Sequence, residues 1–218
     1  MEPTKTSLPE NAYRPLQDGE KYVPIVPAAK PLPEITPWSL LWGLLFAAIF
    51  SMAAAYLGLK IGQVFEAAIP IAILAVGLSV FTGRKNALSE NVMIQSIGAA
   101  SGVVVAGAIF TIPAIYILEL DAKFFQIFLA SLFGGFLGIL FLIPFRRYFV
   151  QEMHGQFPFP EATATTEVLV AGEAGGEQAK ILLKAMAIGG IYDFIIGTFH
   201  WWGEVFTSRA LPFMKGIA

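Results

Sequence analysis

Charge is scarce in this chain, and so are two residue types that carry much of the chemistry of enzymes. Only 14% of the 218 residues are charged, there are two histidines, and there is no cysteine. Soluble domains carry close to a quarter charged residues, so this composition argues against a soluble enzyme and against a disordered chain. The absence of cysteine excludes disulfides, thiolate zinc sites and a cysteine nucleophile. A formal net charge of −2 leaves no basic surplus for binding nucleic acid.

Apolar residues fill the composition instead, at 56% of the chain with a mean hydropathy of +0.67. Long stretches carry no charge, and a helix needs about 20 apolar residues to cross a bilayer. We therefore predict an all-α, polytopic transmembrane helix bundle over residues 38–218, with the lipid bilayer as its main solvent. The predicted spans lie at about 38–59, 63–83, 91–118, 124–145 and 181–202. The length allows one compact unit or a part of a larger one.

The first 37 residues differ from the rest, because they hold eight of the fourteen prolines. Proline lacks a backbone N–H and restricts the residue before it, so residues 1–37 are predicted to form an extended tail. Arginine and lysine concentrate in cytoplasmic connections of membrane proteins. The pairs Arg84-Lys85 and Arg146-Arg147 follow the second and fourth spans. This pattern predicts a cytoplasmic N-terminus and places Trp201-Trp202 at the exit of the fifth span.

Small residues recur every fourth position in several predicted spans. Examples are Gly98 with Gly102 in the third span and Gly134 with Gly138 in the fourth. Lipid gives no hydrophobic drive for helix association, so close approach of small-residue faces is what packs membrane helices. The stripes therefore indicate a tightly packed bundle.

A polar group stands at the start of the third span. Asn91, Gln95 and Gly98 share one helical face, which suits a helix lining a pathway. Glu90 has two interpretations: a functional carboxylate, or a residue that complements the dipole of a helix capped by Asn86 or Ser89.

A short helix is predicted at about 161–171, after two prolines and before a glycine-rich run. Eleven residues extend roughly 16 Å, about half of a membrane. With Glu161, Thr163 and Thr165 near its N-terminus, it fits a half-helix or re-entrant segment, the kind of element with which transporters bind substrates and ions. The alternative is an amphipathic helix lying on the membrane surface.

Asp193 lies within the fifth predicted span, where a charged residue is costly and tends to face a cavity or a partner. It could pair with a cation, relay a proton or serve a structural hydrogen bond. No motif indicates an enzyme: the metalloprotease pattern HExxH, the nucleophile elbow GxSxG and the P-loop are all absent. We expect no metal site and no cofactor.

Three segments, in this order, are similar to motifs of one known family. Tyr56-Leu-Gly-Leu-Lys-Ile-Gly62, Glu90-Asn-Val-Met-Ile-Gln95 and the Phe-Pro-Phe-Pro-Glu-Ala-Thr-Ala-Thr run over 157–165 resemble the oligopeptide transporter superfamily. The bacterial branch, related to the yellow stripe-like metal-chelate carriers, is the most similar. Glu161 departs from the small residue that many relatives carry in the third motif.

The resemblance implies a secondary active transporter of small peptides or metal-chelate complexes, usually driven by a proton gradient, in a cell membrane such as the bacterial inner membrane. Such transporters have well over a dozen spans, so the chain corresponds to about the first third. It would then require the remaining helices of the transporter or other subunits as partners.

On this hypothesis Glu161, Thr163 and Thr165 line the substrate site, Asn91 and Gln95 face them, and Glu90 and Asp193 couple the proton. A second hypothesis, based on the small-residue stripes, is a non-transporting membrane scaffold or assembly subunit.

Overall fold

The computed structural model describes residues 7–27, 29, 32–121, 123–173 and 177–200. All regular structure within these ranges is helical, which confirms the predicted all-α class. The α-helices are α1 (Pro37–Ile61), α2 (Ala68–Phe81), α3 (Leu88–Ile117), α4 (Phe124–Arg147), α5 (Pro160–Glu173) and α6 (Glu177–Phe199). A 3-10 turn, η1 (Glu10–Ala12), lies in the N-terminal segment, and a π-helical turn, η2 (Tyr148–Glu152), continues α4.

Three helices within the described ranges are long and apolar enough to cross a membrane: α1, α3, and α4 together with η2. The helix in the second predicted span is shorter than expected. Residues 63–67 are not helical, and α2 begins only at Ala68. Its 14 residues extend roughly 21 Å, less than the ~30 Å of a bilayer core. Gly62 ends α1 in the left-handed region at φ 72°, and Pro70 fits only the first turn of the next helix.

The fifth predicted span falls in α6 as far as Phe199, but α6 is not one of the three helices that are long and apolar enough to cross a membrane. Trp201-Trp202 lie outside the described residues. The predicted short helix is present as α5 and has 14 residues.

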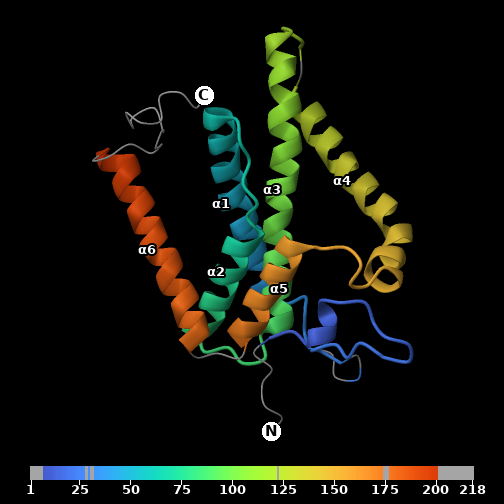
Figure 1. The fold of residues 1–218 in the computed structure, drawn as a ribbon. Helices are drawn as coiled ribbons and strands as arrows, with labels where there is room; N and C mark the ends of the chain where they lie inside the picture. The colour runs from blue at the N-terminus through green and yellow to red at the C-terminus, as the bar shows by residue number, and fades with distance from the viewer. Residues whose placement is uncertain (1–6, 28, 30–31, 122, 174–176, 201–218) are drawn as a thin grey trace, which may run out of the picture.

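Helices α1 and α3 run in the same direction and pack along their length, with α2 antiparallel beside them (Figure 1). The core between them is apolar and holds Phe46, Ala67, Ile71, Ala75 and Ile94. Helix α5 extends this core, because Leu169 packs with Ala72, Val76 and Leu88. These three helices and α5 form the compact part of the chain.

The small-residue stripes pack against neighbouring helices in α1 and α3 and are open in α4. A Cβ atom on Gly98 would lie 2.9 Å from the side chain of Ile71, and one on Gly43 would lie 3.0 Å from that of Ile97. The stripes of α1 and α3 are therefore contact faces, as the spacing predicts. Around Gly134 and Gly138 of α4 nothing lies within 4 Å of such a Cβ.

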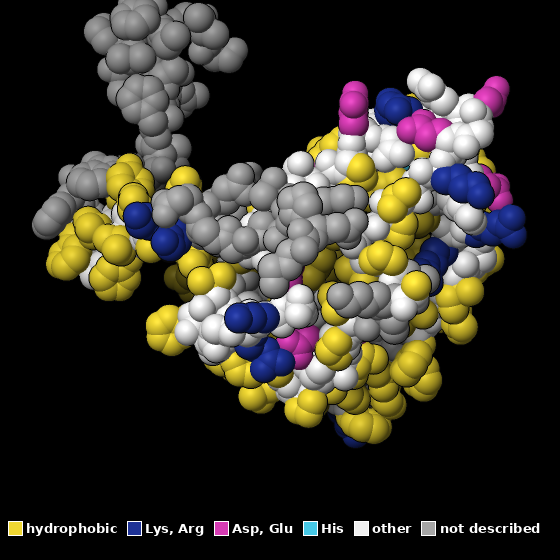
Figure 2. All heavy atoms as spheres, turned by 90° about the horizontal axis from the view of Figure 1, so that it is seen from below, with side chains coloured by type: hydrophobic (Ala, Val, Ile, Leu, Met, Phe, Trp, Pro, Cys, Tyr) yellow, Lys and Arg dark blue, Asp and Glu magenta, His cyan; other side chains and the backbone are white. Residues whose placement is uncertain are grey.

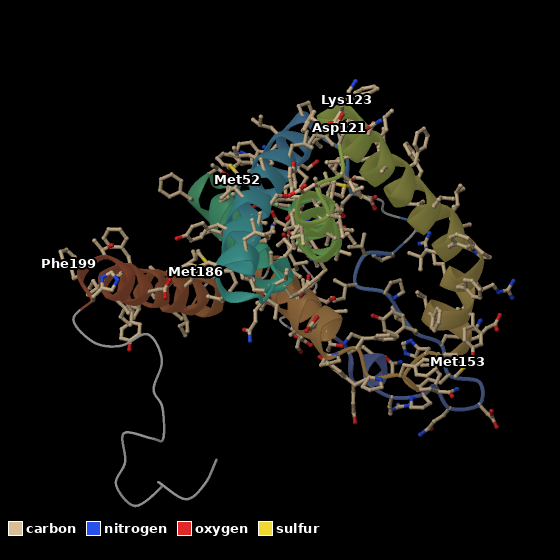
Figure 3. All side chains as sticks on the ribbon, turned by 90° about the horizontal axis from the view of Figure 1, so that it is seen from above. Met52, Asp121, Lys123, Met153, Met186 and Phe199 are labelled. Atoms are coloured by element: carbon tan, nitrogen blue, oxygen red, sulfur yellow. The ribbon has the colours of Figure 1, made fainter. Side chains whose placement is uncertain are left out.

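Helices α4 and α6 stand apart from the compact part on opposite sides (Figures 1 and 3). None of the residues of α4 is buried. The first half of α6 touches α2, where Leu183 fills the space beside Gly77. Figure 3 labels Met186 and Phe199 on α6, and Asp121 and Lys123 at the turn between α3 and α4.

The N-terminal segment lies against α5 and the connection between α4 and α5. The backbone N–H of Leu8 donates to Glu167 Oε1 at 3.2 Å, and His154 Nε2 lies 2.8 Å from the carbonyl oxygen of Asn11. Within the segment, Arg14 pairs with Glu20 at 2.8 Å. This segment, the α2–α3 connection and the end of α4 all lie at the same end of the bundle (Figure 1).

Candidate functional site

An ion pair that is buried on its carboxylate side, together with a hydrogen bond from Thr36, joins three parts of the chain at the end of the bundle where α1 and α3 begin. Glu90 lies in the first turn of α3 and is 4% exposed. Arg84, from the α2–α3 connection, donates from Nη2 to Glu90 Oε1 at 2.7 Å and from Nε to Oε2 at 3.0 Å. Thr36 Oγ1 donates to Glu90 Oε1 at 2.6 Å. We call Thr36, Arg84 and Glu90, with Trp38, the Glu90 clamp.

The local sequence explains how each member of the clamp is held. Thr36 caps α1, since its Oγ1 accepts from the N–H of Ser39 at 3.1 Å while Ser39 Oγ accepts from the N–H of Thr36 at 2.9 Å. The guanidinium of Arg84 lies 4.9 Å from the centre of the Trp38 ring, a cation–π geometry that orients its fork. The first turn of α1 therefore positions both the hydroxyl and the aromatic ring beside Glu90.

The capping expected for α3 is wrong. Its N-cap is Ala87, which offers no side-chain hydrogen bond, and Asn86 adopts a left-handed conformation at φ 54°. The carboxylate of Glu173, at the end of α5, instead interacts with the backbone of Ala87 and Leu88. A carboxylate from a distant helix thus stands at the helix start, where a local cap is usually found.

Asn91 is directed at α2. Its Oδ1 accepts a 2.6 Å hydrogen bond from Ser79 Oγ, and the two residues are 1% and 4% exposed. Gln95, one turn further along α3, is half-buried, and its Oε1 lies 3.4 Å from Ser96 Oγ. The polar start of α3 is therefore a contact between helices in this structure.

The three candidate residues of α5 do not form one cluster. Glu161 is exposed in the first turn, and Thr163 is half-buried. Thr163 lines an aromatic-rich cavity of about 640 Å³ that Phe149, Phe157 and Phe159 also line. Thr165 is 5% exposed, and its Oγ1 has no hydrogen-bond partner among the residues that the structure describes. A spacing of two residues turns a helix by about 200°, so Thr163 and Thr165 lie on different faces.

Asp193 lies exposed in the second half of α6. The structure thus brings Glu90 and Asn91 to the packed start of α3 and leaves Asp193 and Glu161 on open surfaces. Within the described ranges there is no group of three or more His, Asp or Glu side chains that could hold a metal ion.

Sequence reasoning missed Arg84 and Thr36 as members of the site. Arg84 was used only as a marker of membrane topology, although it stands six residues before Glu90 and a short connection keeps the two close. Thr36 is 54 residues away from Glu90. Only the packing of α1 against α3 brings its hydroxyl to the carboxylate.

Comparisons with known proteins identify the family of this chain. The family described as OPT oligopeptide transporter protein matches residues 34–216, which include every member of the Glu90 clamp. A protein of Haemophilus influenzae named "Putative oligopeptide transporter" is 34% identical over 139 residues. That match covers 62% of this chain and 21% of the relative, so the chain spans about a fifth of its length. No solved structure matches the chain. Because the family match covers most of its length, the chain belongs to the OPT oligopeptide transporter family.

Proposed function

We propose that this chain provides the first membrane helices of a proton-coupled secondary transporter for small oligopeptides or metal-chelate complexes. Family membership over residues 34–216 carries the proposal. The three long apolar helices support it, as do the cationic connections at the end that holds the N-terminal segment. On this proposal that end is cytoplasmic, and the membrane is the bacterial inner membrane.

Helix α5 is the proposed substrate element. Its 14 residues extend roughly 21 Å, too short to cross the ~30 Å core of a bilayer. Its N-terminus lies part-way along α3, while its C-terminus lies where α3 begins (Figure 1). The first-turn N–H groups of such a half-helix attract anionic groups, and a peptide carries a terminal carboxylate. We assign Glu161 and Thr163 to this site. Thr165, on another face of α5, and Asn91 and Gln95, in the first turns of α3, are the further residues proposed to take part in substrate binding.

The two carboxylates proposed to exchange the proton are Glu90 and Asp193. Protonation of Glu90 would weaken its bonds to Arg84 and release the hold on Thr36, so it would loosen α1 from the α2–α3 connection. Proton transfer to Glu90 would thereby change how α1 packs at the Glu90 clamp. Asp193 is proposed to face the pathway once further helices cover α6.

The glycine-bearing face of α4 and the open face of α6 are the proposed contacts for those helices. Gly134 lies about 180° around the helix from Ile143, so such a contact leaves the Ile143 face of α4 open. No residue of α4 is buried, and its glycines at 134 and 138 have no neighbour within 4 Å of an added Cβ. Small residues allow close helix packing. The remaining helices of the same transporter, or another subunit, would pack there.

Uptake into proteoliposomes tests the assignment of Glu161. In the complete transporter, Glu161→Gln should reduce peptide uptake driven by a proton gradient. The matched control is Glu119→Gln, which removes a carboxylate at the turn between α3 and α4, at the other end of α3. Unchanged uptake with unchanged pH dependence in the Glu161 variant would remove that residue from the site.

A non-transporting scaffold is the second candidate, and one observation favours it. Glu90 and Asn91 both find their partners inside this chain, as purely structural groups would. The chain contains no cysteine, so a single cysteine at 193 can be labelled selectively. In the complete protein a water-soluble thiol reagent should modify Asp193→Cys if a pathway exists. Absence of labelling, with normal labelling at an exposed control position such as Lys85→Cys, would favour the scaffold.

A further inference from the structure

A second cavity lies between the N-terminal segment and the end of α4, remote from the Glu90 clamp. Its volume is about 800 Å³, within the roughly 300–1,000 Å³ typical of small-molecule sites. Arg146 and Arg147, in the last turn of α4, form part of its wall. Lys21 from the N-terminal segment and His154 from the loop after η2 form another part. Two segments far apart in the sequence thus bring cationic side chains to one cavity.

The charge around this cavity is positive. Among its lining residues, Glu20 is the one carboxylate, and Arg14 already pairs with it at 2.8 Å. Glu152 lies 3.5 Å from Arg147, but both side chains are mostly exposed, and such pairs are weak. The negative end of the α4 dipole accounts for arginines in its last turn. It does not account for Lys21, which belongs to another segment.

The other wall of the cavity is apolar and continuous with the open surface of α4. Ile143 and Val150 line the cavity and are 63% and 67% exposed. The surface of α4 beyond them is open, because none of its residues is buried. Figure 2, from the end that holds the N-terminal segment, shows Lys and Arg side chains next to broad apolar areas. In a membrane, acyl chains would lie along α4 and end where the arginines begin.

From this juxtaposition we propose that the cavity binds the headgroup of an anionic phospholipid. The phosphate lies against Arg146, Arg147 and Lys21, and the acyl chains follow Ile143 along α4. Arginine forks match phosphate oxygens in pairs, and basic pockets at the cytoplasmic ends of membrane helices suit such headgroups. The bound lipid would fasten the N-terminal segment to α4. The proposal does not depend on transport.

Native mass spectrometry of the detergent-solubilised protein tests the proposal with phosphatidylglycerol, phosphatidylcholine and inorganic phosphate as probes. We expect one molecule of phosphatidylglycerol to be retained per chain, in preference to phosphatidylcholine. Arg146→Gln should weaken this binding about fivefold, as expected for one cation near a lipid surface. The matched control is Lys85→Gln, which removes one exposed cation at the same end of the bundle but outside the cavity.

A further variant covers the case in which Arg146→Gln disturbs α4. Lys21→Gln changes the N-terminal segment and leaves α4 unchanged, and it should weaken the binding of phosphatidylglycerol to a similar degree. Equal weakening by Lys85→Gln would mean general surface attraction and would overturn the site. Equal retention of phosphatidylcholine, or displacement of phosphatidylglycerol by millimolar phosphate, would also overturn it, since the ligand would then be an acyl chain or a free anion.

Discussion

The Glu90 clamp makes an asymmetric prediction about its two charged members. The Glu90 side chain is 5% exposed, whereas that of Arg84 is 37% exposed. Arg84→Gln leaves a buried carboxylate with only the hydroxyl of Thr36 to stabilise its charge. Glu90→Gln leaves a guanidinium that can turn to water and can still stack on Trp38. The arginine substitution should therefore cost more stability, although both remove the same ion pair.

The magnitudes follow from the exposure of each partner. Removing one partner of a fully buried pair costs about 3–5 kcal/mol. Water reaches the Arg84 side of this pair, so we expect the lower end of that range, about 3 kcal/mol, for Arg84→Gln. For Glu90→Gln the amide keeps the shape of the carboxylate, and we expect about 1 kcal/mol, as for one ordinary hydrogen bond. The difference of about 2 kcal/mol is roughly a 30-fold change in the unfolding equilibrium.

The assay is unfolding by SDS in mixed micelles, followed by tryptophan fluorescence. Two of the four tryptophans, Trp38 and Trp42, lie at this end of α1 with ring centres 5.7 Å apart, and replacing Trp201 and Trp202 by Phe in all variants makes the signal report on it. The double variant should cost less than the sum of the two single variants, because it leaves no unpaired charge. Equal costs for the two single variants, or a larger cost for Glu90→Gln, would refute this reasoning.

Two further predictions concern the α1–α2–α3 packing and the N-terminal segment. Gly98→Ala should destabilise the protein by about 1–3 kcal/mol, because its Cβ would lie 2.9 Å from the fully buried Ile71. Gly107→Ala on the same helix meets nothing within 4 Å and should be neutral or gain up to about 1 kcal/mol in SDS unfolding; a similar loss in both variants would contradict the packing argument. In the N-terminal segment, hydrogen bonds from Arg14 lower the pKa of Glu20 from 4.5 to about 2. Since the folded-state pKa lies below the unfolded one, the stabilisation by this pair is complete above pH 4.5 and lost as the pH falls to about 2. NMR titration of the Glu20 carboxyl should give a midpoint near 2 that Arg14→Gln moves toward 4.5, and an unmoved midpoint would rule out the pair as the cause.

Much of the helical architecture could be predicted from local sequence. Uncharged runs long enough to cross a bilayer predict α1, α3 and α4, and the prolines before Glu161 with the glycines after Ala171 delimit α5. The start of α2 could not be predicted so well. Hydropathy does not distinguish the non-helical residues 63–67 from a helix, and the position of Pro70 sets the boundary only once the turn at Gly62 is known.

The candidate site depended more on tertiary structure. The carboxylate of Glu90 stood out because a charge beside an apolar span is costly, but its partners come from two other segments. Asn91 was identified as a polar residue on a small-residue face, whereas its bond to Ser79 depends on how α2 lies against α3.

The sequence by itself determined that the chain is helical, that it suits a lipid environment and which polar residues would need partners. These properties depend on composition and on spacing along one helix, where neighbours are set by the 3.6-residue turn. Tertiary structure alone decided which of these polar groups find a partner inside the chain. Glu90 is paired and Asn91 is bonded, while Thr165 Oγ1 is buried without a partner in the described part of the chain. The physical reason is that partners in a membrane bundle come from separate helices, so pairing depends on how those helices are rotated and how closely they approach. Small residues such as Gly98 permit the close approach, but no local sequence pattern specifies which helices meet.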